Sequence, residues 1–182
     1  MSRIVSVSAA GLVMLALAVP ASAAQHIYCT FVGAKQGKFQ GDHGLNGDAT
    51  QIPVFSLMQE LTVPFDPSSG RGTGKRQHSP LVITKSIDRS SPQFFTAAVT
   101  NEILKSVTCT LYRDTDRDAA SSAFYKFTLT GANIVDVQDM GDGSSGNSHG
   151  ADRERISFTY QKIELTDIES GTVAIDDWAQ LL

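Results

Sequence analysis

Two cysteines, Cys29 and Cys109, are the only cysteines in this chain of 182 residues, and each lies in the middle of a segment with alternating apolar residues. Such alternation is typical of a strand with one buried face, so both thiols should face the core. If the two strands are neighbours, a disulfide between them closes a loop of 80 residues. It then stabilises the fold by about 4–5 kcal/mol in the chain-entropy model. The alternative is a pair of buried free thiols that pack as small hydrophobic groups.

The first 23 residues have the layout of a signal peptide. Arg3 supplies the positive start, the uncharged apolar run 4–19 follows, and Ala-Ser-Ala at 21–23 is a cleavage site. The run is short for a membrane span, which needs about 20 apolar residues. We predict a signal peptide over 1–23 and one domain over 24–182 that is secreted or periplasmic, with no stable membrane insertion. An uncleaved N-terminal anchor is the alternative. The exported compartment is oxidising, which favours the disulfide.

The composition describes an ordinary globular protein. Hydrophobic residues make up 41% of the chain and charged residues 19%, which is too apolar for a disordered chain. There are 15 Lys+Arg against 19 Asp+Glu, for a net charge of −4. This acidic balance argues against nucleic acid as a partner, because binding it requires Lys and Arg against the phosphates. With 4 His and 2 Cys, a zinc cluster is also unexpected, and we predict no cofactor.

The pattern along the chain is mainly β, with one helix. Ser90 or Ser91 can cap that helix, and Pro92 suits its first turn. Its apolar face is expected to contain Phe94, Phe95, Ala98, Val99 and Ile103. Strand-like segments occupy 27–32, 51–64, 81–85, 106–112, 124–129, 133–137, 156–165 and the end of 170–178. Many short strands with one helix predict a closed or sandwich-like β fold.

One acidic run resembles the first half of a calcium-binding loop. Asp114, Asp116 and Asp118 alternate as the carboxylates of such a loop do. The glycine expected at its sixth position is Ala119, and the glutamate expected at its twelfth is Tyr125. The run is therefore interpreted as the solvated tip of a hairpin.

Motifs for catalysis are missing from the sequence. There is no Gly-x-Ser-x-Gly nucleophile motif, and the glycine-rich run 70–75 lacks the spacing of a phosphate-binding loop. We therefore predict that the protein is not an enzyme. A weak metal site remains at the N-terminus, where cleavage after Ala23 would make His26 the third residue. Such a terminus can bind Cu(II) or Ni(II) in a square plane of nitrogens. Cleavage after Ala24 would abolish that site, and coincidence is the alternative.

Four stretches in order along the chain carry a family resemblance. They are 78–92, with His-Ser-Pro-Leu-Val-Ile-Thr-Lys and then Ile-Asp-Arg-Ser-Ser-Pro; 107–113, ending in Leu-Tyr-Arg; 124–135; and 154–163. In these stretches, and over about 26–178 as a whole, the sequence resembles the haemolysin-coregulated protein (Hcp) family of type VI secretion systems. The resemblance implies a compact β-barrel of two sheets with one α-helix on its side. It also implies a loop that reaches a neighbouring subunit, and hexameric rings stacked into a tube. Partners would be the secretion-apparatus tip or small effectors in the lumen.

Contacts between subunits are expected at a basic loop. Arg71, Lys75, Arg76 and His78 lie on this loop, and another subunit could present the acidic run 114–118 to it. Such complementarity sets register more than affinity. The alternative is two solvated loops that never meet.

The signal peptide is unusual for the Hcp family, whose members usually lack one. An exported monomeric binding module on the same fold is therefore the second function that we expect.

Overall fold

The structure is a computed structural model that describes residues 25–42, 44–113, 123–141 and 152–178. The proposed signal peptide and the acidic run 114–118 lie outside these ranges. The strands are β1 (Gln25–Gly33), β2 (Gly37–Lys38), β3 (Ile52–Val54), β4 (Ser56–Met58), β5 (Leu61–Thr62), β6 (Gln77–His78), β7 (Leu81–Ser86), β8 (Leu104–Arg113), β9 (Ala123–Met140), β10 (Arg153–Thr159), β11 (Lys162–Asp167) and β12 (Val173–Asp177). The helices are a 3₁₀ turn (Leu45–Gly47) and α1 (Ser91–Val99).

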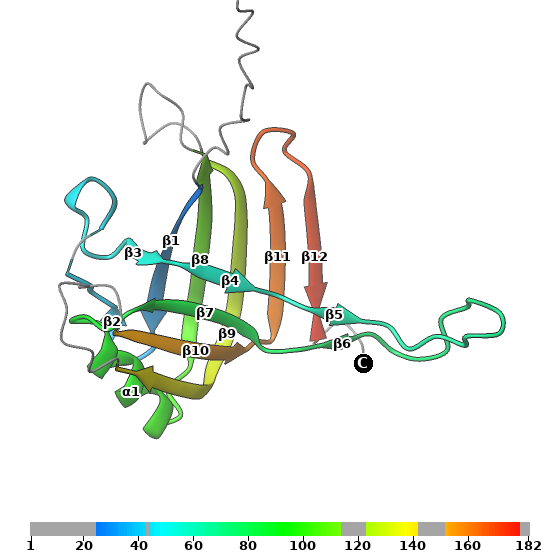
Figure 1. Cartoon of the computed structure of the whole chain (residues 1–182), viewed down its shortest axis with the longest axis horizontal. Coiled ribbons are helices and arrows are strands. Elements are labelled where there is room, and N and C mark those ends of the chain that lie inside the picture. The colour runs from blue at the N-terminus through cyan, green and yellow to red at the C-terminus, as the bar shows by residue number, and fades with distance from the viewer. Residues whose placement is uncertain (1–24, 43, 114–122, 142–151, 179–182) are drawn as a thin grey trace, which may run out of the picture.

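Two antiparallel sheets pack face to face, as Figure 1 shows. One sheet has the order β1-β8-β9-β11-β12, with β2 and β3 on the outer edge of β1. The other consists of the second half of β9 with β10, β7 and β4. Strand β9 takes part in both sheets, and Gly131 in its middle has φ +61°, which glycine adopts at no steric cost.

The predicted mainly β fold with two sheets and one helix is confirmed, but the two sheets form a sandwich-like arrangement rather than a closed barrel. On one side the sheets are joined by β9. On the other side β3 pairs with β1 and β4 pairs with β7, and the ladder is interrupted between them at Phe55. Within the described strands, β12 pairs only with β11 and so leaves an edge.

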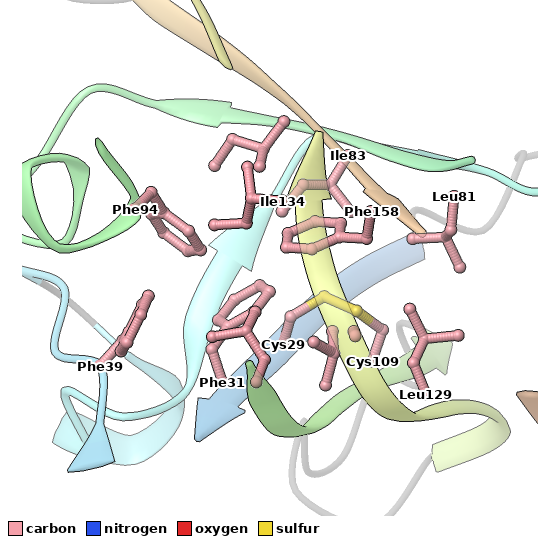
Figure 2. Packing of buried hydrophobic residues seen from close by; sticks show 14 of the residues in the cluster. Cys29, Phe31, Phe39, Leu81, Ile83, Phe94, Cys109, Leu129, Ile134 and Phe158 are labelled. Carbon is pink, nitrogen blue, oxygen red and sulfur yellow. A yellow bond between two sulfur atoms is a disulfide. The ribbon is translucent and has the colours of Figure 1, made fainter. Parts of the chain in front are cut away.

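The core lies between the sheets and beneath α1 (Figure 2). Phe31 is at its centre, with its ring centroid 4.8 Å from that of Phe94 and 5.8 Å from that of Phe158. These separations are in the range at which aromatic pairs attract beyond simple burial. Cys29 and Cys109 lie fully inside the same cluster. The sequence patterns therefore identified both the core strands and the inward side of each cysteine.

Three boundaries differ from those expected. Segments 124–129 and 133–137 form the single strand β9, because Gly131 lets the strand bend instead of ending it. Segment 156–165 is divided between β10 and β11 by a turn, and segment 51–64 contains the three short strands β3, β4 and β5.

Helix α1 buries only part of the expected face: Phe94 is buried, and Ala98 packs against the core. Phe94 and Ala97 are the buried residues of α1, whereas Phe95, Val99 and the following Ile103 are exposed. Apolar residues occupy both sides of this helix, so periodicity alone does not determine which side is covered. No helix in the described part of the chain is long and apolar enough to cross a membrane.

Candidate functional site

The segment 59–79, here called the extended hairpin, protrudes from one end of the sandwich (Figure 1). Its base is the β5–β6 pair, and a bridge between Phe65 and Gly72 continues the ribbon outward. At the tip, the Asp66 carboxylate accepts hydrogen bonds from the backbone of Ser68 and from two serine hydroxyls. These bonds lower the pKa of Asp66. The tip is therefore a structured turn.

The base of the hairpin is held by a polar cluster, here called the hairpin latch: Arg76, His78, Tyr160 and Asp176. Arg76 forms an ion pair with Asp176 through two nitrogens. His78 Nε2 lies 2.7 Å from Asp176 Oδ2, and its Nδ1 lies 3.0 Å from the Tyr160 hydroxyl. The ring of Trp178 packs edge-on against His78 with centroids 5.3 Å apart. The latch thus ties the hairpin to β12 and to the β10–β11 turn.

The hydrogen bonds of the latch fix the tautomer of neutral His78. An ionised carboxylate only accepts hydrogen bonds, so Nε2–H donates to Asp176 and Nδ1 accepts from the Tyr160 hydroxyl. Burial raises the pKa of Tyr160, which keeps its phenol protonated and a poor nucleophile. Both ring nitrogens and the phenol thus take part in hydrogen bonds that connect the hairpin to the rest of the sandwich.

The charge of Asp176 makes the latch sensitive to acid. Hydrogen bonding from Arg76 is the largest cause that lowers the pKa of Asp176 from 3.8 to about 2; burial opposes the shift, and His78 adds to it. Because this pKa is lower in the folded chain than in the unfolded chain, ionised Asp176 stabilises the fold above about pH 4. That stabilisation is lost as the pH falls from about 4 to about 2.

We therefore expect the urea midpoint of the wild type to fall more steeply between pH 4 and pH 2 than that of Asp176→Asn. The measurement is a series of urea unfolding curves at closely spaced pH values. Glu169→Gln is the matched control, because it removes an exposed carboxylate in an ion pair with Arg113, outside the latch. Equal slopes for the wild type and Asp176→Asn would contradict the role given to this carboxylate.

The structure separates the predicted contact residues into two groups. Arg76 and His78 are bonded to Asp176 of their own chain, and their expected contact with acids of another subunit stays a prediction. Arg71 and Lys75 are exposed on the hairpin. Their expected partners Asp114, Asp116 and Asp118 lie outside the described residues, so contact between them and another subunit stays a prediction.

His26 lies on β1, exposed and opposite Tyr112 of β8. The described residues contain no group of three or more His, Cys, Asp or Glu side chains that could hold a metal ion. The proposed Cu(II) or Ni(II) site would need nitrogens from Ala24, which is outside the described ranges. That site stays a prediction.

The two cysteines are bonded to each other in the structure. Cys29 and Cys109 stand directly opposite in the β1–β8 ladder, with Cα atoms 4.1 Å apart. The disulfide therefore joins two neighbouring core strands (Figure 2).

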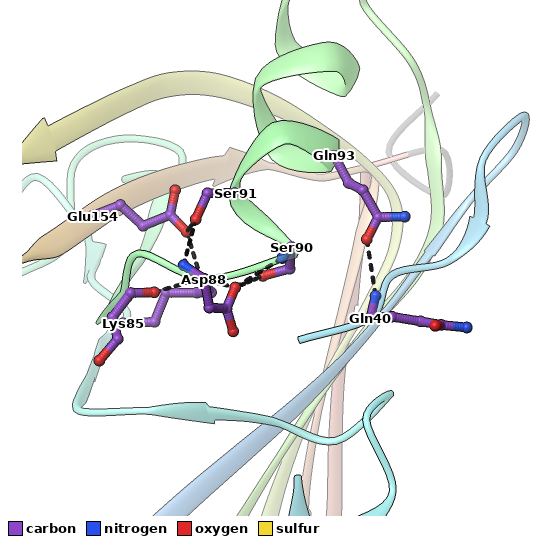
Figure 3. A network of polar contacts seen from close by, with 8 residues as sticks. Gln40, Lys85, Asp88, Ser90, Ser91, Gln93 and Glu154 are labelled. Carbon is purple, nitrogen blue, oxygen red and sulfur yellow. Dashed lines mark hydrogen bonds and ion pairs between the residues drawn. The ribbon is translucent and has the colours of Figure 1, made fainter. Parts of the chain in front are cut away.

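A buried ionic network under the N-terminus of α1 was not predicted (Figure 3). Lys85 Nζ lies 2.5 Å from Glu154 Oε1 and 2.8 Å from Asp88 Oδ1, and neither Lys85 nor Glu154 is exposed. Ser91 donates a hydrogen bond to the same Glu154 oxygen, and Ser90 donates to Asp88. Burial raises the pKa of Asp88, but the bonds from Lys85 and Ser90 outweigh it and lower the pKa overall.

The sequence does contain a signal for this network. In β7 the inward positions are Leu81, Ile83 and Lys85, and in β10 they are Glu154, Ile156 and Phe158. A lysine and a glutamate thus each continue an apolar alternation, which is a reason to expect a buried pair.

Comparisons with known proteins agree with this architecture. Residues 28–166 match the family described as "Type VI secretion system effector, Hcp". The "Major exported protein" of Pseudomonas aeruginosa is 35% identical over 162 residues, which are 83% of this chain and 94% of that protein. The solved structure of the secreted protein Hcp3 from Pseudomonas aeruginosa is similar with a TM-score of 0.68 and 31% identity, covering 85% of this chain and 99% of that one. A crystal structure of another Hcp protein has a TM-score of 0.76 at 24% identity, over 85% of this chain and 98% of that one, and shows the shared fold. The chain therefore belongs to the Hcp family of type VI secretion proteins.

Proposed function

We propose that this chain is the ring-forming subunit of a type VI secretion tube and assembles as a hexamer whose rings stack. The observation that carries the proposal is the extended hairpin. It projects from the sandwich, is held by the latch, and exposes Leu61, Val63 and Phe65. Apolar side chains that are exposed together on an ordered ribbon are typical of a surface that binds a partner protein. In this proposal the lumen of the stacked rings can carry small effectors, the tube can meet the tip of the secretion apparatus, and no catalytic residue is required.

The oligomeric state of residues 24–182 tests the proposal. We expect size-exclusion chromatography with light scattering to give about six subunit masses, because a heterologous contact that closes by rotation makes a ring. Negative-stain electron microscopy should show rings. A particle that stays monomeric at high concentration would overturn the proposal.

A second candidate function is an exported, monomeric binding module. The Cys29–Cys109 disulfide favours it, because such bonds persist in oxidising compartments outside the cytoplasm. It rests on the proposal that residues 1–23 are a signal peptide. Mass spectrometry of the protein recovered from the periplasm tests this: a chain beginning at Ala24 or Gln25 supports export by cleavage, and an intact N-terminus contradicts it.

A further inference from the structure

The Cys29–Cys109 disulfide lies within a frame of apolar side chains from its own sheet. Ile52 of β3 stands opposite Cys29, and Phe127 of β9 stands opposite Cys109. Side chains that are directly opposite in an antiparallel pair lie on the same face of the sheet, so both flank the sulfurs on the inner face. Phe31, two positions further along β1, lies on that face as well. The bond is therefore bordered by apolar groups within the sheet.

The second sheet covers the bond from the other side of the core. In Figure 2, Leu81 of β7 and Phe158 of β10 lie across the core from the two sulfurs. The two cysteines are 0% and 1% exposed. A surface hollow of about 220 Å³ at β1 and β3 is lined by residues within 26–28 and 53–55, and its lining does not include Cys29. A molecule in solvent thus has no contact with either sulfur of the folded chain.

The chemistry of disulfides makes this enclosure consequential. A disulfide is formed or broken when a thiolate attacks a sulfur atom and gives a mixed disulfide. A thiolate is charged, and moving a charge into an apolar interior without a partner is costly. Strand β1 pairs with β8 along its whole length, Gln25–Gly33, and core strands of this kind open with free energies close to that of global unfolding. Exchange at this bond therefore requires the sandwich to open.

We propose that the Cys29–Cys109 bond is made before the sandwich closes, and that the folded chain then keeps the oxidation state in which it folded. Formation of the bond joins two sulfurs and releases two protons, and its two electrons reduce a donor disulfide to two thiols. The donor acts on the chain before β1 and β8 are covered, in an oxidising compartment outside the cytoplasm. A chain that folds in a reducing compartment closes over two thiols and stays reduced when it later meets an oxidant.

The oxidation state of the folded protein is thus a record of where it folded. A chain that is exported unfolded acquires the disulfide, whereas a chain that folds and assembles in the cytoplasm before secretion keeps two thiols. This inference goes beyond the proposed ring and does not rest on it, because the bond is measured and not the assembly.

Reduction of folded, oxidised residues 24–182 by dithiothreitol tests the proposal. Samples taken over time are alkylated and weighed by mass spectrometry, which counts the free thiols. The matched control moves the bond one position along the same two strands, with Thr30→Cys/Thr108→Cys in the Cys29→Ala/Cys109→Ala background. Thr30 and Thr108 also stand opposite each other, but on the outer face of the sheet, and both are partly exposed.

We expect the Cys29–Cys109 bond to be reduced at least about a hundredfold more slowly than the control bond, because its reduction waits for the core to open. In urea below the unfolding transition, its rate should rise with urea as steeply as unfolding followed by circular dichroism does. The rate for the control bond should change little. A Cys29–Cys109 bond that is reduced as fast as the control, or at a rate that urea does not change, would overturn the proposal.

Oxidation of the folded, reduced protein is a second measurement that needs no substitution. The chain is refolded from urea with dithiothreitol, freed of the reductant and incubated with oxidised glutathione. We expect the folded protein to keep two thiols that can be alkylated after denaturation, and the same chain to acquire the bond when glutathione is added in denaturing urea. Prompt bond formation in the folded protein, or a reduced chain that does not regain its native circular dichroism, would contradict the proposal.

Discussion

Replacing both Cys29 and Cys109 by alanine is expected to lower the free energy of unfolding by about 4 kcal/mol, among the largest effects of any change considered for this chain. The bond joins residues 80 positions apart, so its loss frees a long loop in the unfolded chain. The two side chains are also fully buried, and their shortening removes packing within the aromatic core. Guanidinium unfolding curves of the two proteins, fitted with a common slope, measure the difference.

Reduction provides the control for that experiment. We expect a reductant added during unfolding to shift the wild-type midpoint toward that of the Cys29→Ala/Cys109→Ala variant, and to leave the variant unchanged. Alkylation of the denatured, unreduced wild type should label no thiol. Two labelled thiols, together with a midpoint that the reductant does not move, would show that the bond is absent in the protein as isolated.

The core was predictable from the sequence because its signal is local. Alternation around each cysteine indicates its inward side without knowledge of any other strand. The pairing of Cys29 with Cys109 needs more, since it depends on the register between β1 and β8, and that register is set by contacts between distant segments. Alternation therefore left both a disulfide and two free thiols open, and the register of the fold decides between them.

The face of the helix shows the limit of a local signal. Residues Phe94 and Phe95 are adjacent, so they cannot both point into the core from one helical turn. The apolar spacing fits either side, and the core takes Phe94. The apolar side chains left outside, Phe95 and Val99, then line an open hollow beside the second half of β9, although the sequence pattern assigned them to the core.

The hairpin latch was beyond prediction for a different reason. From the sequence alone, Arg76 and His78 are expected to be exposed and available to another subunit, because no acidic residue lies next to them in the sequence. Their partner Asp176 is 100 and 98 positions away, and no periodicity connects them. By contrast, Lys85 and Glu154 each continue an apolar alternation at an inward position. The sequence pattern was therefore enough to predict that both are buried, but not that they pair with each other.

The buried network gives the second large effect, and Lys85→Met is expected to lower the free energy of unfolding by about 3–5 kcal/mol. The substitution leaves Glu154 with no positive charge beside it in a position without exposure. Glu154 is already poorly compensated, because its Oε2 is buried and receives no hydrogen bond from the described residues. Without Lys85, no neighbouring positive charge offsets the free-energy cost of burying the Glu154 carboxylate.

The double variant Lys85→Met/Glu154→Leu distinguishes this cause from simple loss of packing. We expect it to be more stable than Lys85→Met alone, because apolar residues of similar size replace a buried pair at little cost, whereas breaking the pair is costly. Asp88 keeps its bonds from the Ser90 backbone and hydroxyl in both variants. Lys105→Met, at an exposed position on β8, should change stability by less than about 0.5 kcal/mol. Urea unfolding of the wild type, Lys85→Met, Glu154→Leu and the double variant completes the test, with Lys105→Met as the control: strictly additive losses from Lys85→Met and Glu154→Leu would mean that the ion pair contributes nothing beyond the packing of its two side chains.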